Sequence, residues 1–528
     1  MEFIVIPREQ KFPEQGKNKV YLRIDRWNDY QYVTMFQMVI YDKEGHVHAL
    51  GDIKIGFKGQ TEDIATYTKL GNVFTSLDAE YFSVGDSVEY YKVLSKLEPS
   101  YRNEILSSLN DIVLNPEIIS LITDEPVFSV SLLRSQSLSI VKGQYARVLF
   151  GGAELTDYNF RFHRGEGNNY GKIDLMFKVE VDSKPSTNIH AIIGRNGVGK
   201  TTILNGMIDA VVKKNAAGAF YNEDGWESSL INESYFSSLV SVSFSAFDPF
   251  IPPYEQPEPS RGTCYFYIGL KSLIDENKLL TLDDLHVSCV SALSQCFNDD
   301  KKNKRWKSAL EKLSSDENFH AMNLDKLEES YHNVKRNQKK QYDAKEFQTK
   351  YLNAIKPVLT GMSSGHAIVF FTITKLVATV EEKTLVLIDE PESHLHPPLL
   401  SAFIRALSDL LLDKNGVSII ATHSPVVLQE IPKSCVWKIY RRGIDVQHDR
   451  PSIETFGENV GILTNEIFSL EVEKSGFHDL LVKSIESGKT YQEIIKEYKG
   501  QIGSEGRMLL RTMLVSLIDE KDNHDEVD

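Results

Sequence analysis

The stretch "IIGRNGVGKTTIL" (192–204) limits the possible folds of this chain more than any other segment. Gly194, Gly199, Lys200 and Thr201 follow the G-x-x-x-x-G-K-[ST] spacing. In such a loop backbone N–H groups turn toward phosphate oxygens, Lys200 reaches the β and γ phosphates, and Thr201 offers its hydroxyl to Mg²⁺. The spacing therefore predicts a phosphate-binding loop for ATP.

The residues on either side of the loop provide the context that this motif requires. An apolar run at 189–193 predicts a strand, and apolar residues at helical spacing over 203–211 predict a helix. This order places the phosphates at a helix N-terminus, where the helix dipole favours negative charge. A chance glycine-rich turn needs no such context, so we expect an α/β nucleotide-binding domain. Its predicted nucleotide-binding residues are Gly194, Arg195, Asn196, Gly197, Val198, Gly199, Lys200, Thr201 and Thr202.

A second segment supplies two carboxylates. The apolar run Leu385–Ile388 is typical of a strand buried on both faces of a parallel sheet, and Asp389 and Glu390 follow it directly. At the carboxyl end of such a strand, Asp389 can hold Mg²⁺ through water and Glu390 can polarise the water that attacks the γ-phosphate. We therefore predict Thr201 and Asp389 as magnesium ligands and Glu390 as a catalytic residue.

A histidine ends the next predicted strand. The run Val417–Ala421 is followed by Thr422, His423 and Ser424. A lone histidine at a strand end is more often structural, but this strand end is where a sensor of the γ-phosphate is needed. We therefore predict that His423 is catalytic.

Glu392, His394 and His396 offer a competing interpretation, because these residue types bind zinc. No clear fourth ligand lies nearby in the sequence, and a turn beside the nucleotide explains the three residues equally well.

Composition changes along the chain indicate several parts. Residues 1–130 read as a β-rich α+β module, and 145–470 as a larger α/β nucleotide-binding domain with mixed and parallel sheet. Within it, the polar and helical stretch 270–358 reads as a helical insertion rather than as core. The stretch 471–520 predicts C-terminal helices, and 521–528 an acidic, disordered tail.

The overall composition restricts partners and location. The net charge of −15 argues against a general nucleic-acid coat, although 301–350 holds 13 Lys and Arg against 8 Asp and Glu. Apolar runs are too short for a membrane span, and the first residues do not resemble a signal peptide. The four cysteines lack CxxC spacing. We therefore expect a cytoplasmic protein without a membrane partner.

Taken together, these segments resemble the ABC ATPases of the branch shared by SMC, RecF and OLD-type proteins. "GRNGVGKT" resembles their Walker A motif, "LVLIDE" the Walker B motif, "ESHLHP" the D-loop and "ATHSP" the strand of the switch histidine. The resemblance implies ATP and Mg²⁺ as cofactors. It also implies a head-to-tail dimer or higher oligomer, in which each ATP is covered by the partner's signature motif.

Two further motifs differ from the usual pattern of that family. "MSSGH" (362–366) resembles the signature, so the resemblance assigns Ser363, Ser364 and Gly365 to the partner's nucleotide. The Q-loop region "SFSAFDPF" (243–250) has no Gln, and Ser245 or Asp248 are its possible replacements.

A narrower resemblance is to PtuA-like ATPases of bacterial anti-phage systems of the Septu and retron type. It rests on the combination of "SSGHAIVFFTITKLV", "DEPESHLHPPLLSAFIRALSDLL", "IIATHSPVVLQEIP" and "TFGENVGILTNEIF". This implies an ATPase that regulates a separate effector, such as an HNH nuclease. A DNA-repair or chromosome-maintenance ATPase that binds DNA through 301–350 is the alternative. The large N-terminal module, the missing Q-loop Gln and the "ATHSP" strand argue against a transporter subunit. Glu390 and His423 argue against a non-hydrolysing P-loop protein.

Overall fold

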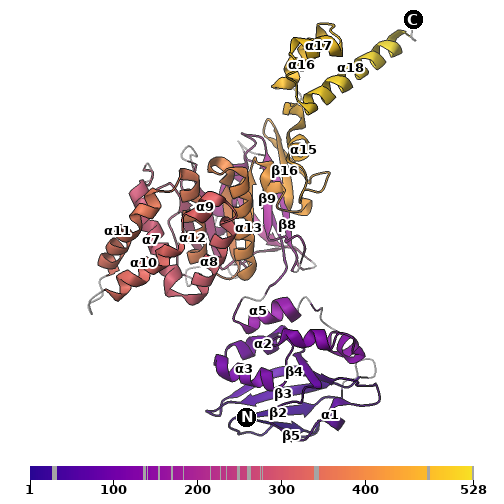
Figure 1. The fold of residues 1–528 in the computed structure, drawn as a ribbon, viewed down its shortest axis with the longest axis vertical. Coiled ribbons are helices and arrows are strands. Elements are labelled where there is room, and N and C mark those ends of the chain that lie inside the picture. Colours follow the sequence, from indigo (N-terminus) through magenta and orange to yellow (C-terminus); the bar gives the residue numbers. More distant parts are fainter. Residues whose placement is uncertain are drawn as a thin grey trace.

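The computed structural model has three parts arranged along its long axis (Figure 1). An N-terminal module lies at one end, a large α/β domain in the middle, and a group of C-terminal helices at the other end. The structure describes residues 1–525 except 27–31, 135–137, 139–140, 153–154, 168–170, 182, 214–215, 226, 233–234, 246–249, 259–262, 274, 276–277, 338–343 and 473–475.

The N-terminal module is a six-stranded sheet in the order β5-β1-β2-β3-β4-β6, covered by helices on one face. The buried hydrophobic residues of the strands form two clusters, one on each face of the sheet, because successive side chains of a strand point to opposite faces. The larger cluster lies under the helices, and a small one of Ile6, Tyr21, Val39 and Tyr41 lies on the other face. The elements are β1 Glu2–Ile6, β2 Lys19–Ile24, β3 Met35–Tyr41, β4 Val47–Phe57, α1 Thr66–Lys69, β5 Val73–Phe74, β6 Tyr81–Gly85, α2 Val88–Ser95, α3 Pro99–Ser108, η1 Pro116–Leu121, η2 Phe128–Leu132, η3 Val141–Tyr145 and α5 Ala146–Leu149.

This module extends further along the chain than the boundary expected at 130. Tyr145, Val148 and Leu149 belong to its hydrophobic core and not to the ATPase domain, which was expected to begin at 145. The reason is that the short helix α5 packs against α2.

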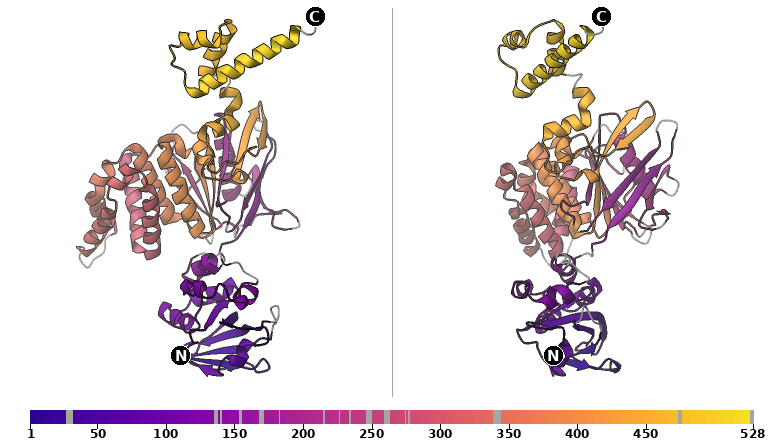
Figure 2. Two further views of the ribbon diagram at one scale, coloured as in Figure 1. Left: turned by 45° about the vertical axis from the view of Figure 1, so that its right-hand side comes forward. Right: turned by 90° about the vertical axis from the view of Figure 1, so that its right-hand side faces the viewer.

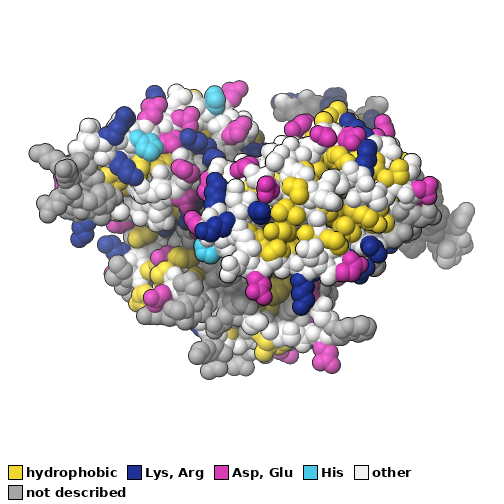
Figure 3. All heavy atoms as spheres, turned by 90° about the horizontal axis from the view of Figure 1, so that it is seen from below, with side chains coloured by type: hydrophobic (Ala, Val, Ile, Leu, Met, Phe, Trp, Pro, Cys, Tyr) yellow, Lys and Arg dark blue, Asp and Glu magenta, His cyan; other side chains and the backbone are white. Residues whose placement is uncertain are grey.

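Seen from below, hydrophobic side chains gather on the surface of the molecule at the end formed by the N-terminal module (Figure 3).

The middle domain contains two sheets on either side of one helix. The segments "YNFRFHR" and "KIDLMFKVEV" form the antiparallel strands β7 and β8, as the alternation of their apolar and polar residues indicates. They belong to a four-stranded sheet in the order β11-β10-β7-β8, which packs against helix α6. The elements are β7 Tyr158–Arg164, β8 Ile173–Val179, α6 Lys200–Val212, β10 Gly218–Asn222 and β11 Ser229–Leu230.

The central sheet has seven strands in the order β13-β12-β14-β15-β9-β16-β17, and all neighbours except β16 and β17 run parallel. All three strands expected from the apolar runs are present, which confirms the predicted α/β fold class. In this sheet β15 lies between β9, which leads into the phosphate loop, and β14, which ends in the carboxylates. The strands are β9 Ile189–Gly194, β12 Ser238–Ser243, β13 Cys264–Gly269, β14 Thr384–Asp389, β15 Val417–Thr422, β16 Val436–Arg442 and β17 Asp445–Asp449.

Helices cover the face of the central sheet opposite to the four-stranded sheet (Figure 2). The expected insertion is helical, but the idea that it lies outside the core is wrong. Its residues Leu293, Trp306 and Tyr351 share one hydrophobic cluster with Val240 and Ile388 of the sheet. These helices are α7 Leu282–Asn298, α8 Asp300–Leu313, α9 Glu317–Ala321, α10 Asp325–Arg336, α11 Ala344–Thr360, α12 Ser364–Thr379 and α13 Pro397–Asp413, with the short turn η5 Pro391–His394 before α13.

The C-terminal helices form a small cluster of their own around Ile485, Ile494 and Leu510. Residues 521–525 of the expected disordered tail continue the last helix, and 526–528 lie outside the described residues. No helix in the described part of the chain is both long and apolar enough to span a membrane. The remaining elements are α14 Pro425–Leu428, η6 Lys433–Cys435, α15 Val460–Val472, α16 Phe477–Glu486, α17 Tyr491–Glu497 and α18 Ser504–Asp525.

Candidate nucleotide-binding site

The predicted phosphate loop joins β9 to α6 with the geometry that the motif requires. Gly197 and Gly199 have φ angles of +79° and +100°, in the left-handed region that side chains other than glycine rarely adopt. Gly199 is the N-cap of α6, and its lack of a side chain leaves the first N–H groups of the helix open toward a ligand. The loop is therefore built as an anion site at a helix N-terminus.

Lys200 begins α6 and is buried, with an exposed fraction of 4%. Its Nζ donates hydrogen bonds to the carbonyl oxygens of Gly194 at 3.0 Å and Arg195 at 3.1 Å. Burial lowers the pKa of Lys200, and the negative charges of Glu390 and its neighbours act in the opposite direction. The ammonium thus lies inside the loop that would surround a phosphate.

The two predicted magnesium ligands meet in the structure. The Thr201 hydroxyl donates a hydrogen bond of 2.8 Å to Asp389 Oδ2. Beside Asp389 in the register of the sheet is Ser243, whose buried Oγ has no hydrogen-bond partner among the described residues. Hydroxyl and carboxylate oxygens are the ligands that Mg²⁺ prefers, so this set of donors fits the ion.

Ser243 was not predicted, although it stands at the start of the expected Q-loop segment. Of the two replacements considered there, Ser245 lies two residues beyond the end of β12, and Asp248 lies outside the described residues. The sequence signal for Ser243 is its place at the end of a strand in the same sheet as Asp389.

Glu390 and His423 lie side by side at the ends of β14 and β15. His423 Nδ1 is 3.7 Å from Glu390 Oε1 and 3.1 Å from Glu392 Oε1. Interaction with the His423 side chain lowers the pKa of Glu390. Interaction with Glu390 and the negative charge of Glu392 raise the pKa of His423. The arrangement holds an ionised carboxylate beside an imidazole that gains a proton readily.

Glu392 has a structural role that sequence reasoning did not assign. Its Oε1 accepts hydrogen bonds from the Thr422 hydroxyl at 2.7 Å and from the His423 backbone N–H at 2.6 Å. Its side chain is 7% exposed, so Glu392 fixes the strand end that carries His423.

The zinc interpretation of Glu392, His394 and His396 is wrong in this structure. Glu392 faces β15, whereas His396 Nε2 pairs with Asp316 Oδ2 at 3.2 Å. Neighbours in sequence are thus directed to different partners, because the chain turns through η5 between them.

The predicted signature lies at the start of α12, as expected. Ser363 is its N-cap, and Ser363 and Ser364 are exposed. A Cβ on Gly365 would lie 2.5 Å from the carbonyl oxygen of His394, so packing within one chain already requires glycine here. The structure thus places these residues at the surface and adds an intramolecular reason for Gly365.

Several basic side chains of the stretch 301–350 form ion pairs within the chain. Lys302 pairs with Glu381 at 2.9 Å, Lys307 with Glu328 at 2.7 Å, and Arg305 with Asp413. Residues 338–343 lie outside the described residues. These ion pairs reduce the positive charge that phosphate groups could meet.

Comparisons with known proteins agree with a P-loop ATPase. A family model described as "AAA domain, putative AbiEii toxin, Type IV TA system" matches residues 273–429. Protein ea59 of Escherichia phage lambda is 50% identical over 518 residues, covering 98% of this chain and 98% of that protein. The small ribosomal subunit biogenesis GTPase RsgA of Mycoplasmopsis pulmonis is 31% identical over 135 residues, which cover 23% of this chain and 46% of that protein.

Among solved structures, an ATP-binding cassette of an ABC transporter in its ADP conformation has 13% identity and a TM-score of 0.29, covering 60% of this chain and 99% of that chain. An SMC head bound to the C-terminal winged-helix domain of ScpA has 12% identity and a TM-score of 0.27, covering 56% and 97%. Similarity at this level is too low to support an argument about function.

Proposed function

Because the chain belongs to the same protein family as ea59 of phage lambda and carries an AAA/ABC-type P-loop ATPase domain, we propose that it binds ATP with Mg²⁺ and hydrolyses it to ADP and phosphate. The observation that carries this proposal is the meeting of Thr201 and Asp389 beside Glu390 and His423. These four side chains come from three separate elements and converge beside one phosphate loop.

Thr201 and Asp389 are the residues that would hold Mg²⁺, with Ser243 as a further oxygen donor. The ion, when bound, neutralises charge on the β and γ phosphates. Lys200 and the loop N–H groups would bind and orient the phosphates of ATP.

Glu390 is the residue that orients and polarises the attacking water. Its lowered pKa keeps it ionised at neutral pH, and an ionised carboxylate can accept a proton or a hydrogen bond from water. To His423, whose backbone N–H donates to Glu392, we assign a hydrogen bond to the γ-phosphate.

Closure of the site by a second copy is part of the proposal. Ser363, Ser364 and Gly365 would cover the ATP of the partner in a head-to-tail dimer or higher oligomer. Support comes from the exposure of the two serines and from the helix N-terminus at which they lie, since such ends favour phosphate.

We further propose that nucleotide state regulates a separate effector in anti-phage defence in the cytoplasm, with an HNH nuclease as the expected class. The resemblance to PtuA-like ATPases supports this. Co-purification from the native host tests it, and recovery of a membrane protein in place of a nuclease would contradict it.

The comparisons do not favour the DNA-repair alternative, and neither do the ion pairs of Lys302, Arg305 and Lys307. Filter binding of duplex DNA across a salt series tests it directly, because phosphate contacts give a steep salt dependence.

The variant Glu390→Gln tests the hydrolytic mechanism. It should lower the ATP hydrolysis rate by at least about 100-fold while ATP binding persists, because only the ionised carboxylate is lost. Glu382→Gln is a matched control, since Glu382 is exposed and follows α12. Unchanged hydrolysis by Glu390→Gln would show that the assignment is wrong.

A further inference from the structure

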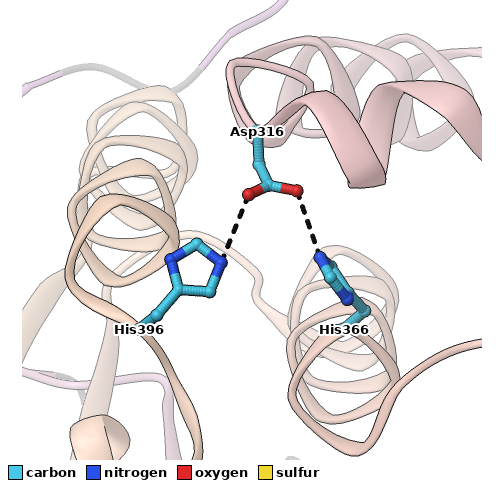
Figure 4. Close-up of side chains that lie close together, drawn as sticks. All are labelled: Asp316, His366 and His396. Atoms are coloured by element: carbon cyan, nitrogen blue, oxygen red, sulfur yellow. Dashed lines mark hydrogen bonds and ion pairs between the residues drawn. The ribbon is translucent and has the colours of Figure 1, made fainter.

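Three helices begin around a cluster of four polar side chains, of which the proposed function uses only Ser363. Figure 4 shows the other three, Asp316, His366 and His396. Asp316 is the N-cap of α9, Ser363 of α12 and His396 of α13. His366, in the first turn of α12, lies between two of them and is 8% exposed. The four residues connect the helical insertion to the signature and to the segment after η5.

The contacts form a continuous chain. Ser363 Oγ is 2.6 Å from His366 Nδ1, and His366 Nε2 is 3.1 Å from Asp316 Oδ1. Asp316 Oδ2 is 3.2 Å from His396 Nε2. Figure 4 shows the carboxylate between the two rings, with one oxygen directed at each.

The direction of each hydrogen bond follows from Asp316. Burial would raise the pKa of Asp316, but hydrogen bonds from the Phe319 N–H and His366 hold that pKa below its usual value, so the carboxylate is ionised and only accepts. His366 Nε2 must therefore carry a proton. In a neutral imidazole Nδ1 is then an acceptor, and it takes the proton of the Ser363 hydroxyl.

This leaves the proton of the Ser363 hydroxyl committed to a hydrogen bond inside its own chain. Its single proton is donated to His366 Nδ1, and its oxygen accepts from the His366 backbone N–H at 3.4 Å. A phosphate oxygen has only acceptor sites, so Ser363 can bind one only by turning its proton away from His366.

We propose that His366, whose tautomer is fixed by Asp316 of the insertion, is a positioning residue that restrains the Ser363 hydroxyl until the partner's nucleotide competes for its proton. The inference rests on the proposed function, because it assumes that Ser363 meets ATP across a dimer. It adds a route by which the insertion controls closure. Asp316 is the N-cap of α9, so a displacement of α9 would alter the hydrogen bond between Asp316 and His366.

A bound divalent cation is the main competing interpretation of the same residues. One ligand atom of Asp316, His366 and His396 each lies within 4.8 Å of the others. Hydrogen bonding is favoured because Asp316 Oδ1 already accepts from the Phe319 N–H at 2.8 Å, and because three helix N-termini, which repel cations, converge here. A metal on Nε2 would also place the remaining proton on Nδ1 and so free the Ser363 hydroxyl.

The test measures ATP-driven dimerisation by light scattering at pH 8 in the Glu390→Gln background, where ATP is not consumed. His366→Phe keeps the ring but removes the acceptor, so dimerisation should need about fivefold less ATP. His366→Asn carries a carbonyl near the position of Nδ1 and should restore the original requirement. His320→Phe, an exposed position on α9, is the matched control.

A double-mutant cycle shows whether His366 acts through Ser363. In the Ser363→Gly background, His366→Phe should have no further effect, because the hydroxyl that it releases is absent. Equal effects in both backgrounds would overturn the inference. It would also be overturned if the parent chain bound one zinc ion per chain and the His396→Asn variant bound none. Absence of ATP-driven dimerisation in the parent chain would overturn the proposed closure itself, whereas an unchanged His366→Phe variant would overturn only the role of His366.

Discussion

The Thr201 hydroxyl donates a hydrogen bond of 2.8 Å to Asp389 Oδ2, although the two residues are 188 positions apart in the sequence. The contact joins the first turn of α6 to the end of β14 and so connects the phosphate loop to the carboxylates. These two side chains are the ones that we propose would hold Mg²⁺.

Replacing Thr201 by Val should therefore raise the Mg²⁺ concentration needed for half-maximal ATP hydrolysis by about tenfold, because one oxygen donor is lost. A magnesium titration at saturating ATP measures this. Thr68→Val, at an exposed position of α1, serves as the control. An unchanged magnesium requirement would show that Thr201 is not a ligand.

Replacing Glu392 by Gln should lower kcat about tenfold and leave the KM for ATP nearly unchanged, because His423 loses its orienting carboxylate. The negative charge of Glu392 also helps to raise the pKa of His423, so the variant should lose the protonated imidazole at a lower pH. A pH profile of kcat tests both statements. If the profile does not move, Glu392 acts on the fold alone.

Ser363→Gly should raise the ATP concentration needed for dimerisation by about tenfold, because one hydrogen bond to a charged phosphate is lost. Thermal stability should change little, because glycine at an N-cap costs only a few tenths of a kcal/mol relative to serine. Gly365→Ala is a less suitable probe, since its Cβ would lie 2.5 Å from the His394 carbonyl oxygen and disturb the chain itself. Light scattering and a thermal melt separate the two effects. Normal dimerisation of the Ser363→Gly variant would show that Ser363 does not contribute to the interface.

The buried Asp111 of the N-terminal module gives a prediction about pH. Burial raises the pKa of Asp111 to about 7, far above its value in an unfolded chain. The unfolded state then releases the proton first, so the free energy of unfolding should fall as the pH rises from about 4 to about 7, by up to about 4 kcal/mol. Denaturant unfolding across this range measures the slope, and Asp111→Asn should reduce it. A stability that rises over the same range would contradict the prediction.

The local structure around the candidate site could be predicted where it depends on residues close together in the sequence. The phosphate loop needs only a strand, two glycines with positive φ and a helix start, and all of these lie within 189–212. Likewise, an apolar run ending in Asp389 and Glu390 predicts a buried strand with carboxylates at its end. Parallel strands then bring such ends to one edge of the sheet, which is why His423 could also be predicted.

The predictions of the domain boundary and of the core were incomplete, because both depend on packing between segments that are distant in the sequence. The N-terminal module extends to Leu149 because α5 packs on α2, and the polar appearance of 270–358 concealed helices whose apolar faces join the central core. A polar outer face and a buried inner face alternate along such helices, so average composition does not reveal the packing.

The sequence by itself determined that this chain has a P-loop ATPase domain with Lys200, Thr201, Asp389, Glu390 and His423 in their expected places. Only the tertiary structure decided that Glu392 orients His423, that Gly365 packs against His394, and that Asp316 holds His366 against Ser363. The physical reason is that a local motif is fixed by backbone conformation and neighbouring residues. The partner of a polar side chain, by contrast, is fixed by how separate helices pack.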